Sequence, residues 1–175
     1  MKSLVFDKIS TDDFYITDFN NTSLYYGEAN YKDIYKIIKK YKKNNFSMLD
    51  VGSGCGKIVF TCSIELDISV DGIEIDKNRF QKSELILEKL NLYDKINLIN
   101  DNFSNLYFGQ YDILYCCNLI FEDKDNELLY TKILKEFTGL FILFKYDNKL
   151  LPYFISQECV NCSWSKNVAI YIFIK

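Results

Sequence analysis

The spacing of apolar residues changes several times along the chain. Some segments repeat them every three or four residues, as in amphipathic helices, and others have the short continuous apolar runs of buried strands. Over Tyr31–Lys43, an apolar face of Ile34, Ile37, Ile38 and Tyr41 recurs at intervals of three and four residues, with lysines opposite. This pattern predicts an amphipathic helix whose apolar face packs on a core.

The chain continues this alternation of strands and helices up to Lys145. Helices are predicted over Lys57–Leu66, Lys77–Leu90 and Asn126–Phe137, and strands over Phe46–Val51, Ile68–Ile75, Lys95–Ile99, Tyr111–Cys116 and Leu140–Lys145. In the middle helix of this series, the expected apolar set is Leu85, Ile86, Leu87 and Leu90. Such alternation is typical of a parallel sheet that helices cover on both faces.

The C-terminal part of the chain has a different pattern. Two β-rich runs, Cys159–Trp164 and Val168–Ile174, are separated by Ser165–Asn167 and predict an antiparallel hairpin. We therefore expect an α/β fold with a doubly wound, mostly parallel seven-stranded sheet, Rossmann-like, ending in this hairpin. One proline, no repeat and no linker-like segment predict a single domain over residues 1–175.

Composition excludes several kinds of chemistry and of location. The chain has no histidine, which excludes a Ser-His-Asp or Cys-His nucleophile and a histidine general base. A net charge of −3 and a pI near 5.1 give no overall basic field for nucleic acid. No apolar stretch approaches the roughly 20 residues of a membrane span, and an acidic residue interrupts the start before a signal-peptide core. We expect an intracellular protein of the cytoplasm or nucleus, without membrane association and with reduced cysteines.

A glycine-rich loop, Asp50–Lys57 (D-V-G-S-G-C-G-K), lies between the first expected strand and the next helix. It departs from a Walker loop, because Val51 and Ile58 stand where that loop requires glycine and serine or threonine. Its G-x-G-x-G spacing also departs from the G-x-G-x-x-G of dinucleotide loops. The pattern resembles motif I of enzymes that bind S-adenosylmethionine, where Asp50 would pair with the α-ammonium group and loop N–H groups would face the methionine part. The alternative is a glycine turn that only reverses the chain.

Two further acidic positions follow later strands. Glu74, at the end of the second strand, can accept hydrogen bonds from both ribose hydroxyls, whereas Asp76 can cap the next helix. In the S-adenosylmethionine enzymes that motif I resembles, the position after the third strand meets adenine; the resemblance implies that Asp101 accepts from its exocyclic amine, with Asn102 or Phe103 covering the ring. Three acidic positions in this order predict a site for S-adenosylmethionine.

Other segments extend the resemblance beyond motif I. Tyr25–Tyr31 (Y-Y-G-E-A-N-Y) precedes the first helix, Cys116–Phe121 (C-C-N-L-I-F) follows the fourth strand, and Cys162–Ser165 (C-S-W-S) lies near the end. Together they resemble the DOT-type histone lysine methyltransferases, and most of all the short forms of protists and large DNA viruses. The resemblance implies a class I methyltransferase fold, with 1–30 as an N-terminal segment and cofactor-covering loop and 31–175 as the α/β core.

The resemblance also implies which residues contact the cofactor. In this family the segment matching Tyr26, Gly27 and Glu28 folds over the cofactor. The motif I residues assigned to cofactor binding, besides Asp50, are Gly52, Gly54, Gly56 and Lys57. The family has threonine in place of Ala29 and glutamine in place of Lys57.

For the transfer step, the resemblance implies that Asn118 and Phe121 lie beside the methyl group, with Asn118 also contacting the cofactor. It further implies that Trp164 and Tyr171 line a channel for the acceptor lysine. Cys117 replaces the first asparagine of the family's paired motif. The alternative is structural, with Asn118 ending a strand and Trp164 in the core of the hairpin.

A lysine acceptor agrees with an apolar aromatic lining, because attack needs the neutral amine and an ordinary lysine has a pKa of about 10.4. Desolvation beside a sulfonium cation would lower that pKa. We therefore expect a protein-lysine N-methyltransferase that acts on a histone or another basic protein. The alternatives are an RNA or small-molecule methyltransferase with the same cofactor half, and a degenerate fold that serves as a scaffold.

The predicted helix Tyr31–Lys43 carries a cluster of lysines from Lys32 to Lys43. These lysines form either a solvated face or a contact surface for nucleic acid or a nucleosome. Cys159 and Cys162 form a single C-x-x-C pair with no second pair and no histidine, so the sequence predicts no metal site. The oligomeric state stays open.

Overall fold

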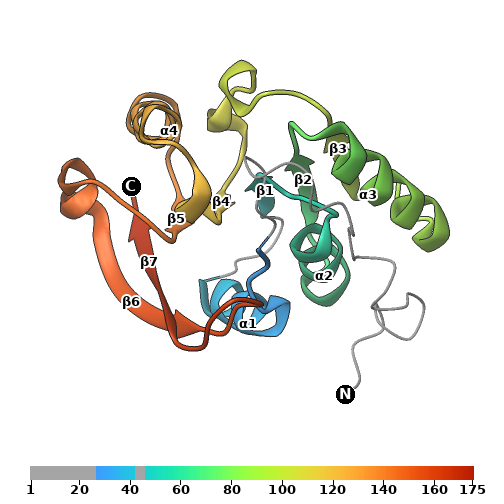
Figure 1. Ribbon diagram of the computed structural model, residues 1–175, viewed down its shortest axis with the longest axis horizontal. Coiled ribbons are helices and arrows are strands. Elements are labelled where there is room, and N and C mark those ends of the chain that lie inside the picture. Colours follow the sequence, from blue (N-terminus) through green and yellow to red (C-terminus); the bar gives the residue numbers. More distant parts are fainter. Residues whose placement is uncertain (1–26, 42–45) are drawn as a thin grey trace.

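The structure is a computed structural model that describes residues 27–41 and 46–175. Its strands are β1 (Ser47–Val51), β2 (Ser69–Ile73), β3 (Ile96–Ile99), β4 (Ile113–Cys116), β5 (Leu140–Leu143), β6 (Phe154–Val160) and β7 (Val168–Ile174). They form one sheet of order β3-β2-β1-β4-β5-β7-β6, in which β1 to β5 are parallel and β7 is antiparallel to both β5 and β6 (Figure 1). The predicted seven-stranded, mostly parallel sheet with its C-terminal hairpin is confirmed.

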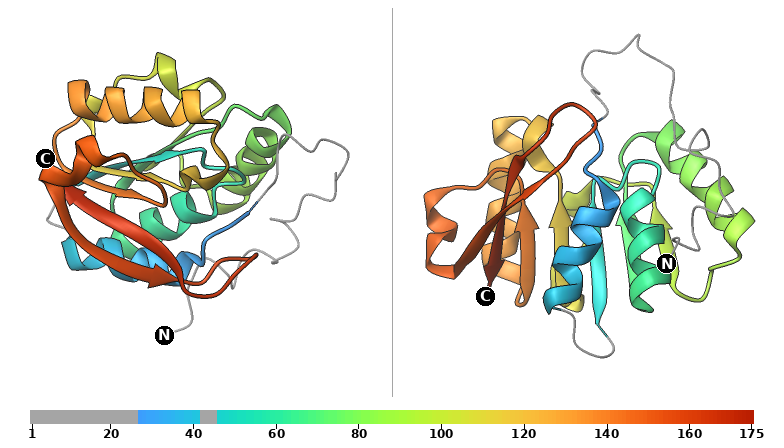
Figure 2. Two further views of the ribbon diagram at one scale, coloured as in Figure 1. Left: turned by 60° about the vertical axis from the view of Figure 1, so that its left-hand side comes forward. Right: turned by 90° about the horizontal axis from the view of Figure 1, so that it is seen from below.

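Helices cover both faces of this sheet. The α-helices are α1 (Tyr31–Tyr41), α2 (Lys57–Leu66), α3 (Lys77–Leu90) and α4 (Asp123–Glu136). Short 3₁₀ turns are η2 (Phe103–Asn105), η3 (Phe108–Gln110), η4 (Asn118–Ile120) and η5 (Asn148–Tyr153). Figure 2 shows α4 on one side of the strands and α1 and α2 on the other. Within the described ranges, no helix has the length and apolar content needed to cross a bilayer.

Two apolar cores lie on opposite faces of the sheet, because successive side chains of a strand point to opposite faces. In β1, Met48 belongs to the core under α1, α2 and α3, whereas Leu49 and Val51 belong to the core under α4. Asp50 alternates with these residues and shares the face of Met48. A carboxylate is thereby placed at the end of the central strand, among apolar neighbours.

Most predicted helices have the expected bounds, and α2 and α3 coincide with their predicted ranges. α1 is described as far as Tyr41, and α4 begins at Asp123, three residues before the predicted start. The prediction for Leu85 was wrong, since this side chain is 60% exposed. Successive helical residues are about 100° apart, and the buried face of α3 spans the arc between Ile86 and Leu87. Leu85 lies about another 100° beyond Ile86 and therefore falls outside this face.

The prediction for the first hairpin strand was also wrong. The run Cys159–Trp164 was expected to be that strand, but β6 ends at Val160, which lies opposite Val168. Beyond Val160 the chain leaves the ladder, and Cys162 instead forms an antiparallel bridge with Ala29. β6 was missed because it is an edge strand whose side chains are mostly exposed or half-buried, so apolar residues do not mark it.

Candidate functional site

Two adjoining cavities lie at the carboxyl ends of β1, β2 and β4, where ligands bind in open α/β sheets. The larger cavity, of about 220 Å³, is lined by Gly27, Gly52, Gly54, Ile73, Glu74, Ile75, Arg79, Asp101, Asn102, Phe103, Cys117, Ile120, Phe121, Glu122 and Asp125. The smaller cavity, of about 40 Å³, shares Gly27, Gly52, Gly54 and Cys117 and adds Glu28, Ala29, Asp50, Ser53, Lys57, Ile58 and Tyr115. Most of the residues predicted for a cofactor therefore surround one continuous space.

The glycine loop between β1 and α2 needs its glycines for conformational reasons. Gly52, Gly54 and Gly56 have φ angles of 76°, 57° and 82°, which side-chain-bearing residues rarely adopt. The Gly52 N–H donates to the carbonyl of Ile73 at 2.9 Å, and the Gly54 N–H donates to Glu74 Oε2 at 2.8 Å. These bonds fix the loop to the end of β2, so its backbone forms a wall of both cavities.

Asp50 is the most unusual group of the site. Its side chain is 2% exposed, and the described part of the chain offers its carboxylate neither a hydrogen bond nor an ion pair. Burial, with a smaller contribution from the charge of Glu74, raises the pKa of Asp50 well above its ordinary range. A buried carboxylate without a partner is unfavourable, so the smaller cavity fits a ligand that brings a cation such as an α-ammonium group.

Glu74 has partners but keeps capacity for more. Its Oε2 accepts from Gly54, and its Oε1 accepts from the Asp76 N–H at 2.9 Å. A carboxylate has about four acceptor positions, so about two remain for hydroxyl groups in the larger cavity. Asp76 caps α3 by accepting from the Arg79 N–H at 2.9 Å, as its alternative assignment predicted.

The far end of the larger cavity carries the polar turn after β3. Asp101 Oδ1 accepts from the Asn102 N–H at 2.7 Å and from Asn105 Nδ2 at 2.9 Å. Asn102 Oδ1 caps η2 by accepting from the Ser104 N–H at 2.9 Å. These bonds use one oxygen of Asp101 and hold the residue at the cavity wall.

Two aromatic rings form the apolar part of this end. The rings of Phe103 and Phe121 lie 5.8 Å apart between centroids, with an angle of 15° between their planes. Both line the larger cavity, which suits a flat heteroaromatic ligand. Phe121, predicted beside the methyl group, thus lies against Phe103 at the predicted adenine end.

Asn118 lies outside the walls of both cavities and is completely buried. Its Nδ2 donates to Asn126 Oδ1 at 2.6 Å and to the carbonyl of Lys145 at 2.8 Å. Its Oδ1 accepts from the N–H groups of Phe144 and Lys145, both at 3.0 Å. The side chain thus joins the end of β4 to α4 and to the end of β5, which is the structural role given as its alternative.

Cys117, the residue before Asn118, is the one that faces the ligand space. It lines both cavities and so marks the boundary between them. Burial, followed by the influence of nearby Cys162, raises the pKa of its thiol to about 12. Cys117 is therefore a neutral, weakly polar group at this boundary.

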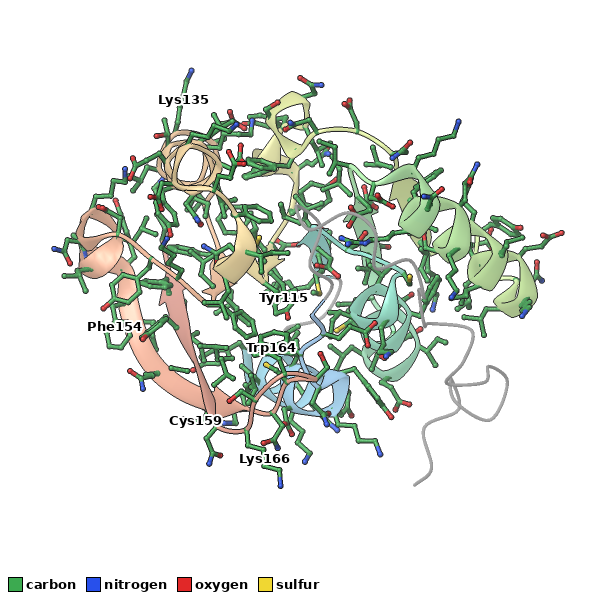
Figure 3. All side chains as sticks on the ribbon, viewed as in Figure 1. Tyr115, Lys135, Phe154, Cys159, Trp164 and Lys166 are labelled. Carbon is green, nitrogen blue, oxygen red and sulfur yellow. The ribbon has the colours of Figure 1, made fainter. Side chains whose placement is uncertain are left out.

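The segment ahead of α1 closes the smaller cavity. Glu28 forms an ion pair with Lys57, the first residue of α2, and both line this cavity. Gly27 borders both cavities, and the indole of Trp164 packs directly on it. Figure 3 shows Trp164 between the hairpin tip and the ends of the central strands, whereas Lys166 lies at the outer edge. Tyr26 lies outside the described residues.

Tyr171 lies apart from this group. It stands opposite Leu143 in the β5–β7 ladder, and its ring centroid is 4.6 Å from that of Tyr146. Among the described residues, the structure therefore brings together the predicted cofactor residues other than Gly56 and Asn118. Phe121 lines the same space and Trp164 packs beside it, whereas Tyr171 lies apart.

Several lining residues were not predicted from the sequence. Arg79 and Ile75 could have been found, because the N-cap at Asp76 places the first turn of α3 beside the end of β2. Glu122 and Asp125 carried a signal only for the start of a helix.

Comparisons with known proteins give a family match and a fold. The family model described as histone methylation protein DOT1 matches residues 15–139. No curated protein matches the chain.

Solved structures are similar over most of the fold. Magnesium protoporphyrin IX methyltransferase from Synechocystis PCC 6803, solved with bound SAM, has a TM-score of 0.67 and 10% identity over 83% of this chain and 77% of its own. An RNA methyltransferase from Salinibacter ruber, in complex with S-adenosyl-L-homocysteine, has a TM-score of 0.63 and 14% identity over 81% and 88%. A candidate S-adenosyl-L-methionine-dependent methyltransferase from Methanococcus maripaludis has a TM-score of 0.57 and 19% identity over 65% and 54%. The chain thus spans about half of that last protein, and at these identities the likeness shows the class I fold.

Proposed function

The chain belongs to the DOT1 family of histone methylation proteins, which use S-adenosylmethionine, and on this premise we propose that it is a protein-lysine N-methyltransferase acting on a histone or another basic protein. The observation that carries the proposal is the buried carboxylate of Asp50 at the end of β1, for which residues 27–41 and 46–175 supply no partner. A cationic amino-acid group is the ligand that this position favours. The protist or viral form of the family stays a prediction.

The cavity residues would hold the three parts of the cofactor. Asp50 would pair with the α-ammonium group and Lys57 with the α-carboxylate, because the two opposite charges share the smaller cavity. Glu74 would accept from the ribose hydroxyls, and Asp101 from the adenine amine. Phe103 would cover the base.

When bound, S-adenosylmethionine supplies an electrophilic methyl group on a sulfonium cation. The boundary of the cavities at Cys117 is the position at which this part of the cofactor fits, since it separates the methionine side from the adenosine side. Ile120, which lines the larger cavity with Cys117, and Trp164, which packs on Gly27, provide exposed apolar surface. Such surface excludes water and favours the neutral form of an acceptor lysine, so alignment supplies the catalysis without a histidine base.

The alternative acceptors and the scaffold role lead to different results. A scaffold has no use for Asp50, because an unpaired buried carboxylate only lowers stability. Calorimetry with S-adenosylhomocysteine tests this point, and an absence of binding heat contradicts the enzymatic proposal. For the acceptor, radiolabel from the methyl group is expected on core histones and is expected to survive nuclease. Label only in RNA or in a small molecule contradicts the lysine proposal.

A pair of substitutions separates the two halves of the site. We expect Glu74→Ala to weaken binding of S-adenosylhomocysteine about tenfold or more, because two backbone contacts and two hydroxyl contacts are lost. We expect Trp164→Ala to slow methyl transfer while affinity for S-adenosylhomocysteine changes less than about threefold. An equal loss of cofactor affinity in both variants contradicts this division.

We also propose that α1 contacts nucleic acid beside the substrate protein, as in a nucleosome in the nucleus. Lys32, Lys36, Lys39 and Lys40 are all exposed on this helix, and Lys40 is already in an ion pair with Glu158 at 2.6 Å. Lys42 and Lys43, predicted to belong to this face, lie outside the described residues. The remaining lysines suit phosphate contacts, whose affinity falls with salt.

A further inference from the structure

Two segments far apart in the sequence join beside the cavities. They are Gly27–Asn30, ahead of α1, and Asn161–Ser165, at the tip of the β6–β7 hairpin, and we call them together the site cover. Ala29 and Cys162 form its antiparallel bridge. The bridge brings the hairpin tip onto the segment that closes the smaller cavity.

Hydrogen bonds fasten the two halves of the site cover to each other and to α1. The Asn30 N–H donates to the carbonyl of Asn161 at 2.7 Å, and the Ser163 N–H donates to the carbonyl of Glu28 at 2.8 Å. In return, the Glu28 N–H donates to Ser163 Oγ at 3.1 Å. The Asn161 N–H donates to Asp33 Oδ2 at 3.1 Å. These bonds and the bridge join the two segments into one unit.

The site cover touches the cofactor space at one end and the acceptor side at the other. At the first end, Glu28 pairs with Lys57, which lines the smaller cavity together with Asp50. At the second end, the site cover carries Trp164, whose ring packs on Gly27 and is 46% exposed.

We infer that the site cover transmits occupancy of the cofactor cavity to Trp164, with Lys57 and Glu28 as the link and Ser163 as a positioning residue. The inference rests on the proposed function, because the ligand it concerns is the cofactor. A cofactor carboxylate at Lys57 competes with Glu28 for the same ammonium group. The backbone of Glu28 is hydrogen-bonded to Ser163, and Trp164 is the next residue along the chain. A change in the position of Glu28 therefore moves Trp164. Acceptor handling therefore depends on prior cofactor binding.

Trp164 is the only tryptophan in the chain, so its fluorescence reports on the site cover alone. The experiment titrates the full chain with S-adenosylhomocysteine and follows tryptophan emission, excited where tyrosine does not absorb, in parallel with calorimetry. In the unaltered protein we expect a saturable change in emission with the calorimetric Kd. Glu28→Gln keeps the backbone bonds but removes the charge. It is expected to retain or raise affinity for S-adenosylhomocysteine, because Lys57 has one competitor fewer, and to lose most of the emission change.

Ser163→Ala and Ser165→Ala form a matched pair on the hairpin tip. The Ser163 hydroxyl accepts from Glu28, whereas the Ser165 hydroxyl contacts only the neighbouring carbonyl of Lys166, at 3.3 Å, among the bonds of the described residues. We expect Ser163→Ala to weaken the emission change and to raise KM for core histones about three- to tenfold, with KM for S-adenosylmethionine unchanged. We expect Ser165→Ala to leave both readouts as they are.

The outcomes distinguish this inference from the proposed function. No calorimetric heat in the unaltered protein removes the proposed function, and the inference with it. Heat without an emission change, or an emission change that Glu28→Gln and Ser163→Ala both leave intact, overturns the inference alone. A loss of S-adenosylhomocysteine affinity in Ser163→Ala also overturns it, because the site cover would then belong to the cofactor site itself.

Discussion

Substitution of Gly27 by alanine tests whether Trp164 depends on contact with the cavity wall. A Cβ at this position would lie 2.5 Å from both Cε3 and Cζ3 of the Trp164 ring. Carbon atoms make their best contacts at about 3.5–4.0 Å, so the ring or the segment must retreat by about 1 Å or more. Overpacking of this kind costs about 1–3 kcal/mol. Because nearly half of Trp164 is exposed, we expect the ring to move outward and the loss of stability to lie near the lower end of this range.

The assay is quenching of tryptophan emission by acrylamide, together with steady-state kinetics. We expect Gly27→Ala to raise the quenching constant and to lower kcat/KM for the acceptor about tenfold, with cofactor affinity changed less than about threefold. Trp164→Ala removes the clash, so adding Gly27→Ala to it is expected to cost no further activity or stability. The reasoning is refuted if quenching stays unchanged, or if Gly27→Ala is equally harmful with and without the indole.

Three further predictions concern separate parts of the molecule. Asp50→Asn is expected to weaken binding of S-adenosylhomocysteine about 10- to 100-fold while raising the melting temperature of the ligand-free protein. Because the folded-state pKa of Asp50 is raised, ionisation of this carboxyl destabilises the fold. The stability that asparagine adds is therefore expected to grow as pH rises above about 4 and to vanish below that pH. A stability gain in thermal unfolding that does not change with pH contradicts this reasoning. Asn118→Ala is expected to cost about 3 kcal/mol and about 6–12 °C in melting temperature, because it leaves the N–H groups of Phe144 and Lys145 without their acceptor and removes a donor to the Lys145 carbonyl. Lost activity at an unchanged melting temperature would instead show a direct role in transfer. Charge reversal at Lys36 and Lys39 is expected to weaken binding to a DNA duplex. Binding measured over a salt series is expected to show a shallower dependence of log K on log [salt], by the amount that about two lost phosphate contacts would give.

The sequence predicted those parts of the site that depend on the order of strands. Asp50 and Glu74 are the second-last residues of predicted strands, and Asp101 follows the next strand, so a parallel sheet brings them to one edge wherever the exact bounds lie. The turn residues Asn102 and Phe103 followed for the same reason. Motif and topology together therefore sufficed to predict that these residues lie around one space.

Side-chain direction and pairing register were harder to predict. The motif located Asn118 next to the site, but η4 turns its amide into the protein and leaves Cys117 facing the cavities. The resemblance assigned Tyr171 to the lysine channel from its position in a strand, and a shift of one residue exchanges the two faces of a strand. Contacts such as Trp164 on Gly27 join segments far apart in the sequence, and no local pattern encodes them.

The isolated carboxylate at the end of β1 has a consequence for the lifetime of the protein in a cell. A ligand that binds only the native state adds RT ln(1 + [L]/Kd) to its stability, about 2.7 kcal/mol at a hundredfold excess over Kd. Here the ligand also neutralises a charge that otherwise weakens the native state. The population exposed to proteases and chaperones should therefore rise when the methyl donor is scarce. Abundance of this protein would then follow the nutritional state that governs donor supply, through turnover and without any change in transcription.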